Sequence, residues 1–377
     1  MDSKLEVLCV TTKLSIGGVQ TFFVNYAPLL VKYGIVLDFV VQTNEPQVFD
    51  ELMQDLGSKI FTVTSINVSK RKFMSDIKKI LKSNPNISIV HAHQNFSNIF
   101  SLWAAKECHV PVRISHSHNN YESNSFIKEC ARNLFRITLP LFATDYWACS
   151  NQAAQWLYGK RQKDVCCQII NNAISTEKFQ FHEENRKIIR NQLQLQDKLV
   201  WIHIGTFSRA KNHIFLLELF HSYCLENDNY TLLLCGDGDL RPQIEEKIVL
   251  LGLKSKVILL GAVINCEKYL SAADIFVFPS LHEGFPLSVI EAQASGLSCI
   301  ISDAVPDDAV LLPNVIKCSK MDMGIWKKAI DSVLKISFVR KSAKELIVQS
   351  HYDIKLESKR LAEMYKEALE REMSCKH

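Results

Sequence analysis

The segment Ser280–Asp303, SLHEGFPLSVIEAQASGLSCIISD, decides the fold of this 377-residue chain. It follows the apolar run Asp274–Phe278, which is typical of a buried parallel strand. Pro286 suits the first position of a helix and Gly296 suits its end, so we predict a helix between them. A second apolar strand follows. In such a strand–loop–helix–strand unit the loop lies at the carboxyl edge of the sheet, where ligands bind.

Two carboxylates are placed in this unit. Glu283 lies in the loop, and Glu291 lies about two turns into the predicted helix. The free amides of Leu287 and Ser288, with the positive end of the helix dipole, would form a phosphate site between them. The pattern therefore suits a sugar nucleotide, with one carboxylate on the sugar and the other on the ribose. A solvated surface helix with incidental acids fits the same spacing.

The sequence Glu283–Glu291, EGFPLSVIE, and the AQASG that follows resemble the paired-glutamate signature of retaining nucleotide-sugar glycosyltransferases. The family is the glycosyl transferases group one class, also called glycosyltransferase family four. The resemblance extends over nearly the whole chain. It implies an α/β protein with two doubly wound, Rossmann-like domains facing across a cleft, the GT-B fold, and a C-terminal helix that crosses back to the first domain.

The composition limits the classes of protein to which this chain can belong. A chain of this length, with 47% hydrophobic residues, can bury two separate cores. The net charge of +4 and the lack of an Arg-rich or aromatic-interleaved stretch argue against nucleic-acid binding. The 12 cysteines show no CxxC pair, so we expect neither zinc nor a disulfide framework. Without a signal-peptide pattern or a long apolar run, we expect a cytoplasmic protein.

We expect the first domain to span 1–178 together with the terminal helix, 355–377, and the second domain to span 179–354. Weak periodicity and high charge density over 175–195 indicate the crossing between them. The first strand, Leu5–Thr11, runs into Gly17 and Gly18, a generic anion loop before a helix. In the family, a glycine pair at this place lies near the donor diphosphate and the acceptor.

Two strands of the first domain each end in a histidine pair. His91 and His93 end one strand, and His116 and His118 end a later one, followed by Asn119. We expect the i, i+2 spacing to point the two rings of a pair to opposite faces, so that no pair chelates a metal jointly. The resemblance implies that His116 contacts the donor sugar as a catalytic group, with His118 as the second choice. It places His91, His93, His118 and Asn119 as acceptor-side candidates.

A glycine turn in the second domain is followed by basic residues, TFSRAK, which indicate another phosphate-binding loop. Lys211 matches the family's diphosphate-binding lysine. The family normally has an arginine directly after the glycine, where this chain has Thr206, so Arg209 is the candidate for that phosphate. Further along, Gly236 belongs to a strand-end GxG, and Val263 matches the family's nucleobase corner.

The predicted site therefore combines three catalytic candidates, His116, Glu283 and Lys211, with a larger donor-binding set and no metal. The donor-binding residues are Gly17, Gly18, Arg209, Lys211, Gly236, Val263, Glu283, Gly284, Phe285, Pro286, Leu287, Ser288 and Glu291.

The resemblance implies a retaining, metal-independent transfer from a UDP-sugar, a hexose or N-acetylhexosamine, to a lipid-linked glycan in bacterial exopolysaccharide or capsule synthesis. The basic segments 69–72 and 159–163 could meet an anionic membrane surface, although an ordinary solvated basic face explains them equally well. Two other functions stay open: a sugar-nucleotide epimerase or hydrolase of the same architecture, and a non-catalytic nucleotide-sugar-binding partner. A nicotinamide dehydrogenase fits poorly, because the first turn lacks GxGxxG.

Overall fold

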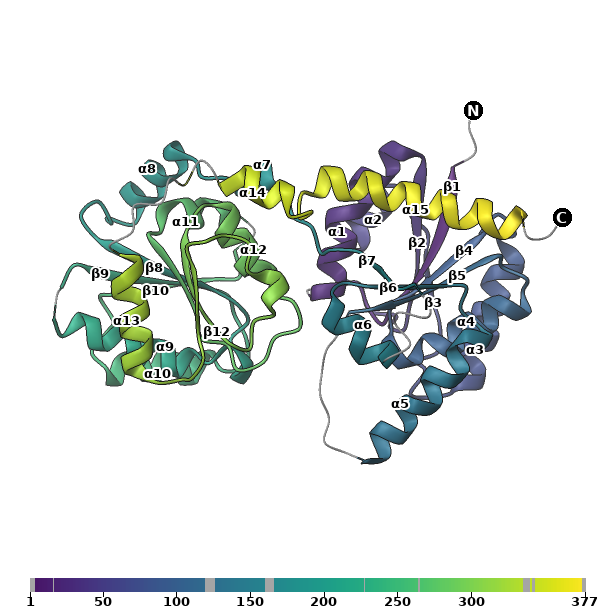
Figure 1. Ribbon diagram of the computed structural model, residues 1–377, viewed down its shortest axis with the longest axis horizontal. Coiled ribbons are helices and arrows are strands. Elements are labelled where there is room, and N and C mark those ends of the chain that lie inside the picture. Colours follow the sequence, from purple (N-terminus) through teal and green to yellow (C-terminus); the bar gives the residue numbers. More distant parts are fainter. Residues whose placement is uncertain are drawn as a thin grey trace. The chain divides into compact units, whose positions relative to one another are not determined.

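The computed structural model describes residues 4–15, 17–118, 126–159, 166–226, 228–263, 265–334, 340 and 343–374, without side chains over 126–131. These residues form two compact units (Figure 1). Unit 1 comprises Met1–Ala173 and Ile354–His377, and unit 2 comprises Ile174–Asp353. The sequence led us to expect divisions at 178/179 and 354/355. The units divide at 173/174 and 353/354, and Ile174 pairs with Asp353 inside unit 2.

Unit 1 is built on a parallel sheet of seven strands, counted among the described residues, in the order β3-β2-β1-β4-β5-β6-β7. The strands are β1 (Leu5–Val10), β2 (Ile35–Val41), β3 (Ile60–Thr62), β4 (Ile89–Ala92), β5 (Val112–Ser117), β6 (Asp145–Ala148) and β7 (Gln168–Ile169). The order reverses direction between β1 and β4. The carboxyl ends of these two strands therefore border the topological switch point, where open α/β sheets bind ligands.

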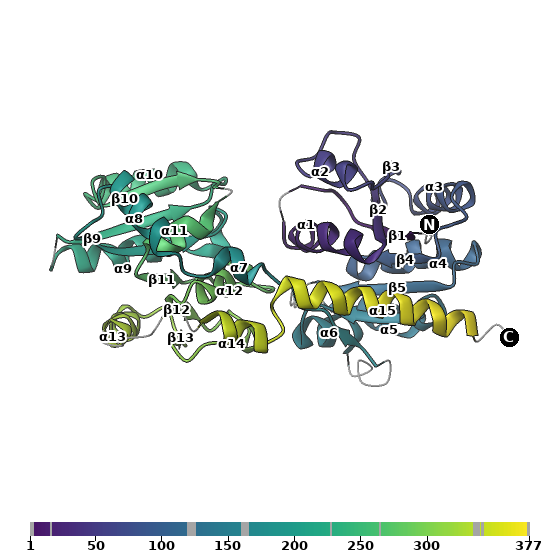
Figure 2. The same ribbon diagram turned by 90° about the horizontal axis from the view of Figure 1, so that it is seen from above.

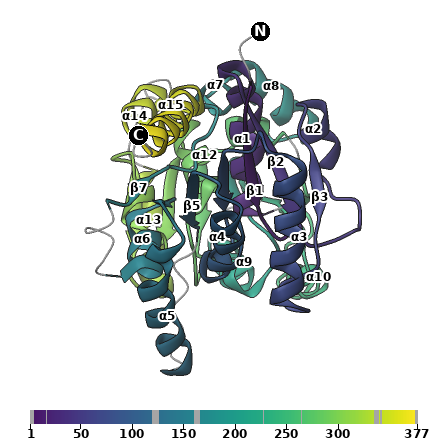
Figure 3. The same ribbon diagram turned by 90° about the vertical axis from the view of Figure 1, so that its right-hand side faces the viewer.

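Alternate residues of the unit 1 strands enter two separate cores, as the period of two in a strand requires. One core is covered by α3 (Lys70–Ser83), α4 (Asn98–Glu107), α5 (Phe126–Thr138) and α6 (Asn151–Tyr158). The other is covered by α1 (Gly18–Leu30), α2 (Asp50–Asp55) and α15 (Ile354–Ser374). Figure 3 shows α1 and α15 apart from α4, α5 and α6, and Figure 2 shows the same unit from above. Short 3-10 turns complete the unit: η1 (Val31–Tyr33), η2 (Asn95–Ser97) and η3 (Leu139–Leu141).

The C-terminal helix packs back onto unit 1, as expected. Leu361, Tyr365 and Ala368 of α15 recur on one face and are buried in the same core as α1. This stripe docks a helix of 21 residues whose other faces are largely polar, and its many Glu, Lys, Leu, Ala and Met residues also favour the helical state.

Unit 2 repeats the plan with a parallel sheet in the order β10-β9-β8-β11-β12-β13. Its strands are β8 (Leu199–Ile204), β9 (Tyr230–Cys235), β10 (Val257–Gly261), β11 (Ile275–Phe278), β12 (Ser298–Ser302) and β13 (Val315–Cys318). One face is covered by α9 (His213–Cys224), α10 (Arg241–Leu250) and α13 (Met323–Val333), and the other by α7 (Thr176–Phe179), α11 (Cys266–Ala272), α12 (Leu287–Ala294) and α14 (Ala343–Gln349). Two 3-10 turns, η5 (Arg209–Lys211) and η6 (Asp307–Ala309), lie at strand ends.

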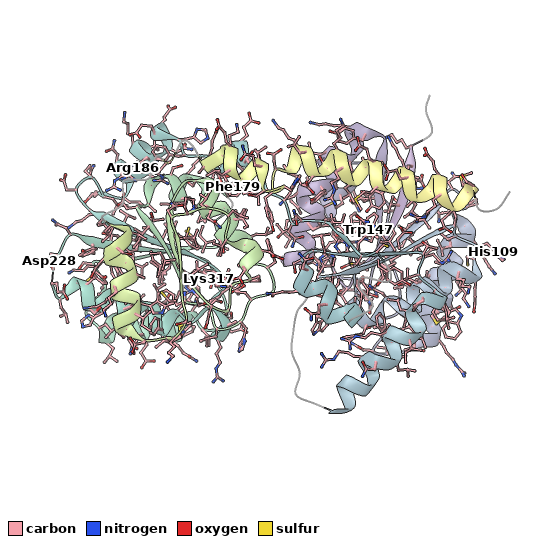
Figure 4. The ribbon with its side chains drawn as sticks, viewed as in Figure 1. His109, Trp147, Phe179, Arg186, Asp228 and Lys317 are labelled. Atoms are coloured by element: carbon pink, nitrogen blue, oxygen red, sulfur yellow. The ribbon has the colours of Figure 1, made fainter. Side chains whose placement is uncertain are left out.

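The interpretation of 175–195 as a mere crossing is wrong. This stretch holds α7 and α8 (Glu183–Gln192), which belong to unit 2. Helix α8 lacks a clear apolar stripe because arginines make much of its packing. Arg186 donates to Asp274 at 2.6 Å and to carbonyls at the end of α11, and Arg190 repeats that pattern (Figure 4 labels Arg186). Charged side chains that act as packing groups leave no hydrophobic period to detect.

Candidate functional site

The segment that decided the fold forms the predicted unit. Helix α12 begins at Leu287, directly after Pro286, and ends at Ala294. Gly296 follows in the left-handed conformation, with φ of 69°. A Cβ added there would lie 2.6 Å from the backbone of Arg340, so glycine is required both by conformation and by close packing.

Glu283 and Lys211, which lie 72 residues apart in the sequence, form an ion pair in unit 2. The Nζ of Lys211 donates to Oε1 of Glu283 at 2.6 Å. The same carboxylate oxygen accepts a short hydrogen bond from the hydroxyl of Ser280. The Lys211 ammonium also lies 4.7 Å from the centroid of the Phe278 ring, a cation–π contact. Both charged side chains are largely buried, which strengthens their interaction.

The loop that carries Lys211 is held by the loop that carries Glu283. The Ser280 hydroxyl, whose single proton is shared with Glu283, lies 2.8 Å from the carbonyl oxygen of Ala210, and the amide of Leu281 donates to the same carbonyl at 2.6 Å. These loops follow the paired strands β8 and β11, which flank the switch point of the unit 2 sheet. Unit 2 thus places a lysine and a glutamate together where the topology favours a ligand.

Glu291, the second glutamate of the motif, lies on α12 and is half-buried. Burial raises the pKa of its carboxyl to about 7, with Glu267 adding to the rise and Lys178 opposing it. The thiol of Cys266 lies 4.0 Å from its Oε2. This carboxylate therefore changes its charge near neutral pH, which is a frequent property of groups at functional sites.

The other predicted donor-binding residues occupy loops of the two units. Position 236 must be a glycine, because a Cβ on Gly236 would lie 2.0 Å from the carbonyl oxygen of Gly205. Val263 is half-buried against the core that contains α12. Arg209 and Thr206 are both exposed, and among the described residues the guanidinium of Arg209 has no hydrogen-bonding or ionic partner. The ring of Phe285 stacks on Tyr352 at 5.6 Å.

In unit 1, Gly17 caps helix α1 and Gly18 begins it. The carbonyl of Gly17 accepts from the hydroxyl of Thr21 at 3.0 Å, and Gln20 donates to the carbonyl of Lys13 at 2.8 Å, so the helix closes the loop that precedes it. A Cβ at Gly18 would meet nothing within 4 Å, which leaves that position sterically open.

The four histidines of unit 1 form one buried cluster, which we call the histidine array: His91, His93, His116 and His118. The Nε2 of His91 lies 3.0 Å from Nδ1 of His116, and Nδ1 of His93 lies 2.7 Å from Nε2 of His118. Tyr365 of α15 closes one end, with its hydroxyl 2.6 Å from Nδ1 of His91.

The prediction that each pair points to opposite faces is wrong. The ring centroids of His91 and His93 lie 4.0 Å apart, and those of His116 and His118 also lie 4.0 Å apart. Residues at i and i+2 of a strand share a face, so all four rings meet on the side of the sheet that α1 and α15 cover. Phe22 of α1 lies against three of them, at 5.6 to 6.0 Å.

Aromatic walls and burial keep the array uncharged. Trp147 of β6, labelled in Figure 4, lies edge-on to His91 at 4.9 Å. Burial lowers the pKa of His118 to about 3 and holds the pKa values of His91, His93 and His116 well below the ordinary value, with the neighbouring imidazoles adding to the effect.

Two groups in this region have ligand atoms within 4.8 Å of one another, a distance compatible with a metal ion: Cys9 with His91 and His93, and His93 with His116 and His118. The joint arrangement that the sequence argued against is therefore sterically open. Whether the ring nitrogens offer lone pairs to a metal ion depends on which of them carry protons.

A polar hollow of about 410 Å³ lies in unit 1 at the ends of β1, β2 and β3. Lys13, Ser15, Gln42 and Ser65 are among its lining residues. Gln42 accepts from the amide of Ile66 at 2.8 Å, while its Nε2 and the Ser15 hydroxyl are buried without a partner among the described residues. Sequence reasoning missed this hollow, although polar residues at the ends of adjacent strands were a usable signal.

Other predictions have mixed outcomes. Asn119, and 160–163 of the second basic segment, lie outside the described residues. Lys70, Arg71 and Lys72 are exposed in the first turn of α3. Sequence reasoning also missed Ser280 as a partner of Glu283 and Tyr365 as a partner of His91. Within the described part of the chain, no helix is both long enough and apolar enough to span a bilayer.

Comparison with known proteins connects both units to one group of enzymes. Residues 16–178 match the model of Glycosyltransferase Family 4, and residues 185–366 match that of Glycosyl transferases group 1. The putative glycosyltransferase EpsF of Bacillus subtilis is 34% identical over 313 residues, which cover 81% of each chain. The chain belongs to the glycosyl transferases group 1 family. It is a glycosyltransferase.

More distant relatives of this glycosyltransferase include an Escherichia coli enzyme named UDP-Gal:alpha-D-GlcNAc-diphosphoundecaprenol alpha-1,3-galactosyltransferase, 24% identical over 80% of each chain. Among solved structures, Anabaena Alr3699/HepE in complex with UDP has a TM-score of 0.79 at 17% identity, covering 97% of this chain and 100% of that one. The lipopolysaccharide glycosyltransferase WaaG has a TM-score of 0.67 over 96% of this chain and 99% of its own. The glycosyltransferase has the GT-B fold.

Proposed function

We propose that this glycosyltransferase moves a sugar, with retention of anomeric configuration, from a UDP-hexose or UDP-N-acetylhexosamine to a lipid-linked glycan in bacterial surface polysaccharide synthesis. The observation that carries the proposal is the Lys211–Glu283 pair beside the N-terminus of α12. The named activities of the relatives support the donor and acceptor classes: one is a diphosphoundecaprenol galactosyltransferase, and another makes capsular polysaccharide in Staphylococcus aureus.

The chemical demand is stabilisation of a leaving diphosphate. The bond between the anomeric carbon and the phosphate oxygen breaks, and negative charge grows on that oxygen. Lys211, with Arg209 and the amides of Leu287 and Ser288, supplies positive potential there without a metal ion. Preorganised donors of this kind typically contribute about 2.7–4 kcal/mol each to the lowering of the barrier. The exposed, unpaired guanidinium of Arg209 is free to turn toward a phosphate.

The remaining residues orient the donor. Glu283 accepts hydrogen bonds from sugar hydroxyls once Lys211 turns to the phosphate, Glu291 accepts from the ribose, and His116 donates to the sugar. The acceptor oxygen bonds to the anomeric carbon on the face that the diphosphate leaves, and its proton passes to the departing phosphate oxygen. Attack on that face retains the configuration and needs no base from the protein.

The acceptor glycan is assigned to the polar hollow of unit 1. Its lining offers the amide of Gln42, the hydroxyls of Ser15 and Ser65 and the ammonium of Lys13, which suit hydroxyl groups and an anionic phosphate. The chain acts in the cytoplasm, at the inner membrane face that holds such acceptors. The exposed start of α3 would add about 1 kcal/mol of attraction per basic residue near anionic lipid.

The test is a transfer assay with purified protein, a panel of UDP- and GDP-sugars, and synthetic undecaprenyl-diphosphate sugars in detergent. Labelled sugar in the lipid fraction is expected with a UDP-sugar. Free or epimerised sugar without any acceptor would favour the hydrolase or epimerase alternative. Tight donor binding with no turnover on any acceptor would favour a non-catalytic partner.

A further inference from the structure

A continuous hydrogen-bonded chain runs from the C-terminal helix into the histidine array. The hydroxyl of Tyr365 lies 2.6 Å from Nδ1 of His91, and Nε2 of His91 lies 3.0 Å from Nδ1 of His116. All three side chains are completely buried. The chain ends at Nε2 of His116, which has no hydrogen-bond partner among the described residues.

The direction of the protons along this chain follows from counting donors and acceptors. A neutral imidazole carries one N–H and one lone pair. If Tyr365 donates its hydroxyl proton to Nδ1 of His91, then His91 donates from Nε2 to His116, and His116 carries its own proton on Nε2. Only that last N–H then lacks a partner.

The opposite direction leaves more groups unsatisfied. His116 would donate from Nδ1 to His91, and His91 would donate from Nδ1 to the oxygen of Tyr365. The hydroxyl proton of Tyr365 would then need another acceptor, and the described residues offer none. A buried hydroxyl donor and the lone pair on His116 Nε2 would both be unpaired. Buried polar groups avoid this state, so the network assigns the proton to Nε2 of His116.

The second pair adds a matching constraint. His93 and His118 share one hydrogen bond of 2.7 Å, and Nε2 of His93 and Nδ1 of His118 are both buried and unpartnered. Whichever ring donates, one of these two nitrogens carries a proton and the other a lone pair. The array as a whole therefore presents two N–H donors and one lone pair.

The groups around the chain keep this arrangement uncharged. Burial depresses the histidine pKa values and raises the pKa of Tyr365 well above its usual range. Cys9 of β1 lies beside His91 and His93, and burial raises the pKa of its thiol as well. Phe22 and Trp147 supply apolar walls. No proton leaves or enters such a network easily near neutral pH.

We infer that Tyr365 and His91 are positioning residues that hold the proton of His116 on Nε2, so that the histidine array offers N–H donors and a single acceptor nitrogen to the hydroxyl groups of an uncharged sugar. The inference about the ligand rests on the proposed function, whereas the proton assignment does not. The ring of Phe22 lies across three of the imidazoles, so a sugar reaches them only when that side chain moves.

The same count of protons and lone pairs argues against a metal ion in the histidine array. A divalent ion held by His93, His116 and His118 needs three imidazole lone pairs at about 2.0–2.1 Å. The array offers one free lone pair. Freeing two more would break the hydrogen bond between His93 and His118 and leave the hydroxyl proton of Tyr365 without an acceptor. The other group, Cys9 with His91 and His93, fails by the same count, because both ring nitrogens of His91 are already used in the hydrogen-bonded chain.

The direct test is the tautomer of each histidine, read from nitrogen chemical shifts and long-range proton–nitrogen couplings in full-length protein labelled at histidine. His116→Gln and His91→Gln variants assign the two signals. Both rings are expected as neutral imidazoles with the proton on Nε2. A proton on Nδ1 of His116, or a charged imidazolium at neutral pH, would overturn the assignment.

Three variants test the positioning role. Tyr365→Phe removes only the hydroxyl that starts the chain, so His91 and His116 are expected to become tautomer mixtures and kcat/KM to fall about 10-fold. His91→Gln keeps an amide that can donate to His116 and is expected to preserve its Nε2 proton, whereas His91→Phe is expected to lose it. Tyr26→Phe is the control, because the hydroxyl of Tyr26 donates to the carbonyl of Asn171.

Unchanged tautomers and unchanged transfer in Tyr365→Phe would overturn the proposal. So would one equivalent of zinc bound in equilibrium dialysis with Zn²⁺ alone, if His116→Ala abolished that binding. If the tautomers are as expected but no sugar is transferred by the wild type, the proton assignment stands and the proposed function fails. The two failures are therefore distinguishable.

Discussion

The ammonium of Lys211 lies 2.6 Å from Oε1 of Glu283, and this ion pair joins the loops that follow two neighbouring strands, β8 and β11. When no sugar nucleotide is bound, the positive charge of Lys211 and the negative charge of Glu283 compensate each other. A diphosphate would compete for Lys211, and the hydroxyls of a sugar would replace Lys211 on Glu283. The pair therefore keeps two oppositely charged groups ready within a largely buried site at low electrostatic cost.

Removal of either charge should abolish most transfer while leaving the fold intact. Lys211→Ala and Glu283→Gln are each expected to lower kcat by about 10²–10³-fold, the usual effect of losing one preorganised group. Arg209→Ala is expected to lower kcat less, because the exposed guanidinium of Arg209 is not held in place before the diphosphate binds. Initial-rate kinetics with circular dichroism on each variant provides the check. Near-wild-type transfer by either of the first two would remove them from the site.

His116 and His118 should differ when each is replaced by alanine. His116→Ala removes the Nε2–H that we assign to the donor sugar and should reduce transfer as strongly as the Lys211 variant. His118→Ala should reduce it less, because its partner His93 retains one hydrogen-bonding nitrogen. Parallel transfer and donor-binding assays decide between them. Full activity in His116→Ala together with loss in His118→Ala would assign the sugar contact to His118 instead of His116.

Donor affinity should depend on pH through Glu291. Its pKa of about 7 means that it is mostly protonated at pH 6 and mostly a carboxylate at pH 8. The carboxylate accepts hydrogen bonds from ribose hydroxyls and the acid accepts less well, so KM for the donor should fall as pH rises from 6 to 8. Glu291→Gln should remove this trend. A KM that stays pH-independent in wild type would contradict the role on the ribose.

The histidine array should make the protein sensitive to acid. The folded-state pKa values lie below the unfolded value of about 6.5, so the unfolded chain binds more protons once the pH falls below that value. Stability is then fully present above about pH 7 and is lost as the pH falls, by up to about 1.4 kcal/mol per histidine per pH unit. Thermal melting between pH 8 and 5 measures this, and His93→Gln should flatten the curve. A melting temperature constant down to pH 5 would exclude buried neutral histidines.

Gln42 should affect the acceptor and not the donor. Gln42→Glu keeps the oxygen that holds the amide of Ile66 but removes the buried Nε2 donor of the hollow. KM for the lipid-linked acceptor is expected to rise several-fold, about the effect of one lost hydrogen bond, while donor binding stays unchanged. If Gln42→Glu alters KM for the donor instead, the acceptor does not bind in this hollow.

The regular elements were predictable where one face is uniformly apolar. The run over 275–278, Pro286 and Gly296 specified β11, α12 and its end, because each residue acts through local conformation. Helix α8 escaped notice because it packs through Arg186 and Arg190. No pattern of apolar residues records such an interaction.

The sequence identified candidate residues for the site but not the contacts between them. The sequence assigned Lys211 and Glu283 to separate loops, but their pairing depends on strands β8 and β11 being neighbours, which is a property of the sheet. The histidine pairs were recognised, yet a wrong assumption about which strand positions share a face hid their convergence. The partnership of His91 with Tyr365, 274 residues away, depends on how the last helix docks.

The most direct test of the account is the anomeric configuration of the transferred sugar. Purified protein, a UDP-α-hexose and a lipid-diphosphate-linked acceptor are incubated, and the new linkage is assigned by proton NMR of the product. The account predicts an α linkage that is formed by wild type and lost in Lys211→Ala and Glu283→Gln. A β linkage, or an α linkage formed equally well by these variants, would contradict it.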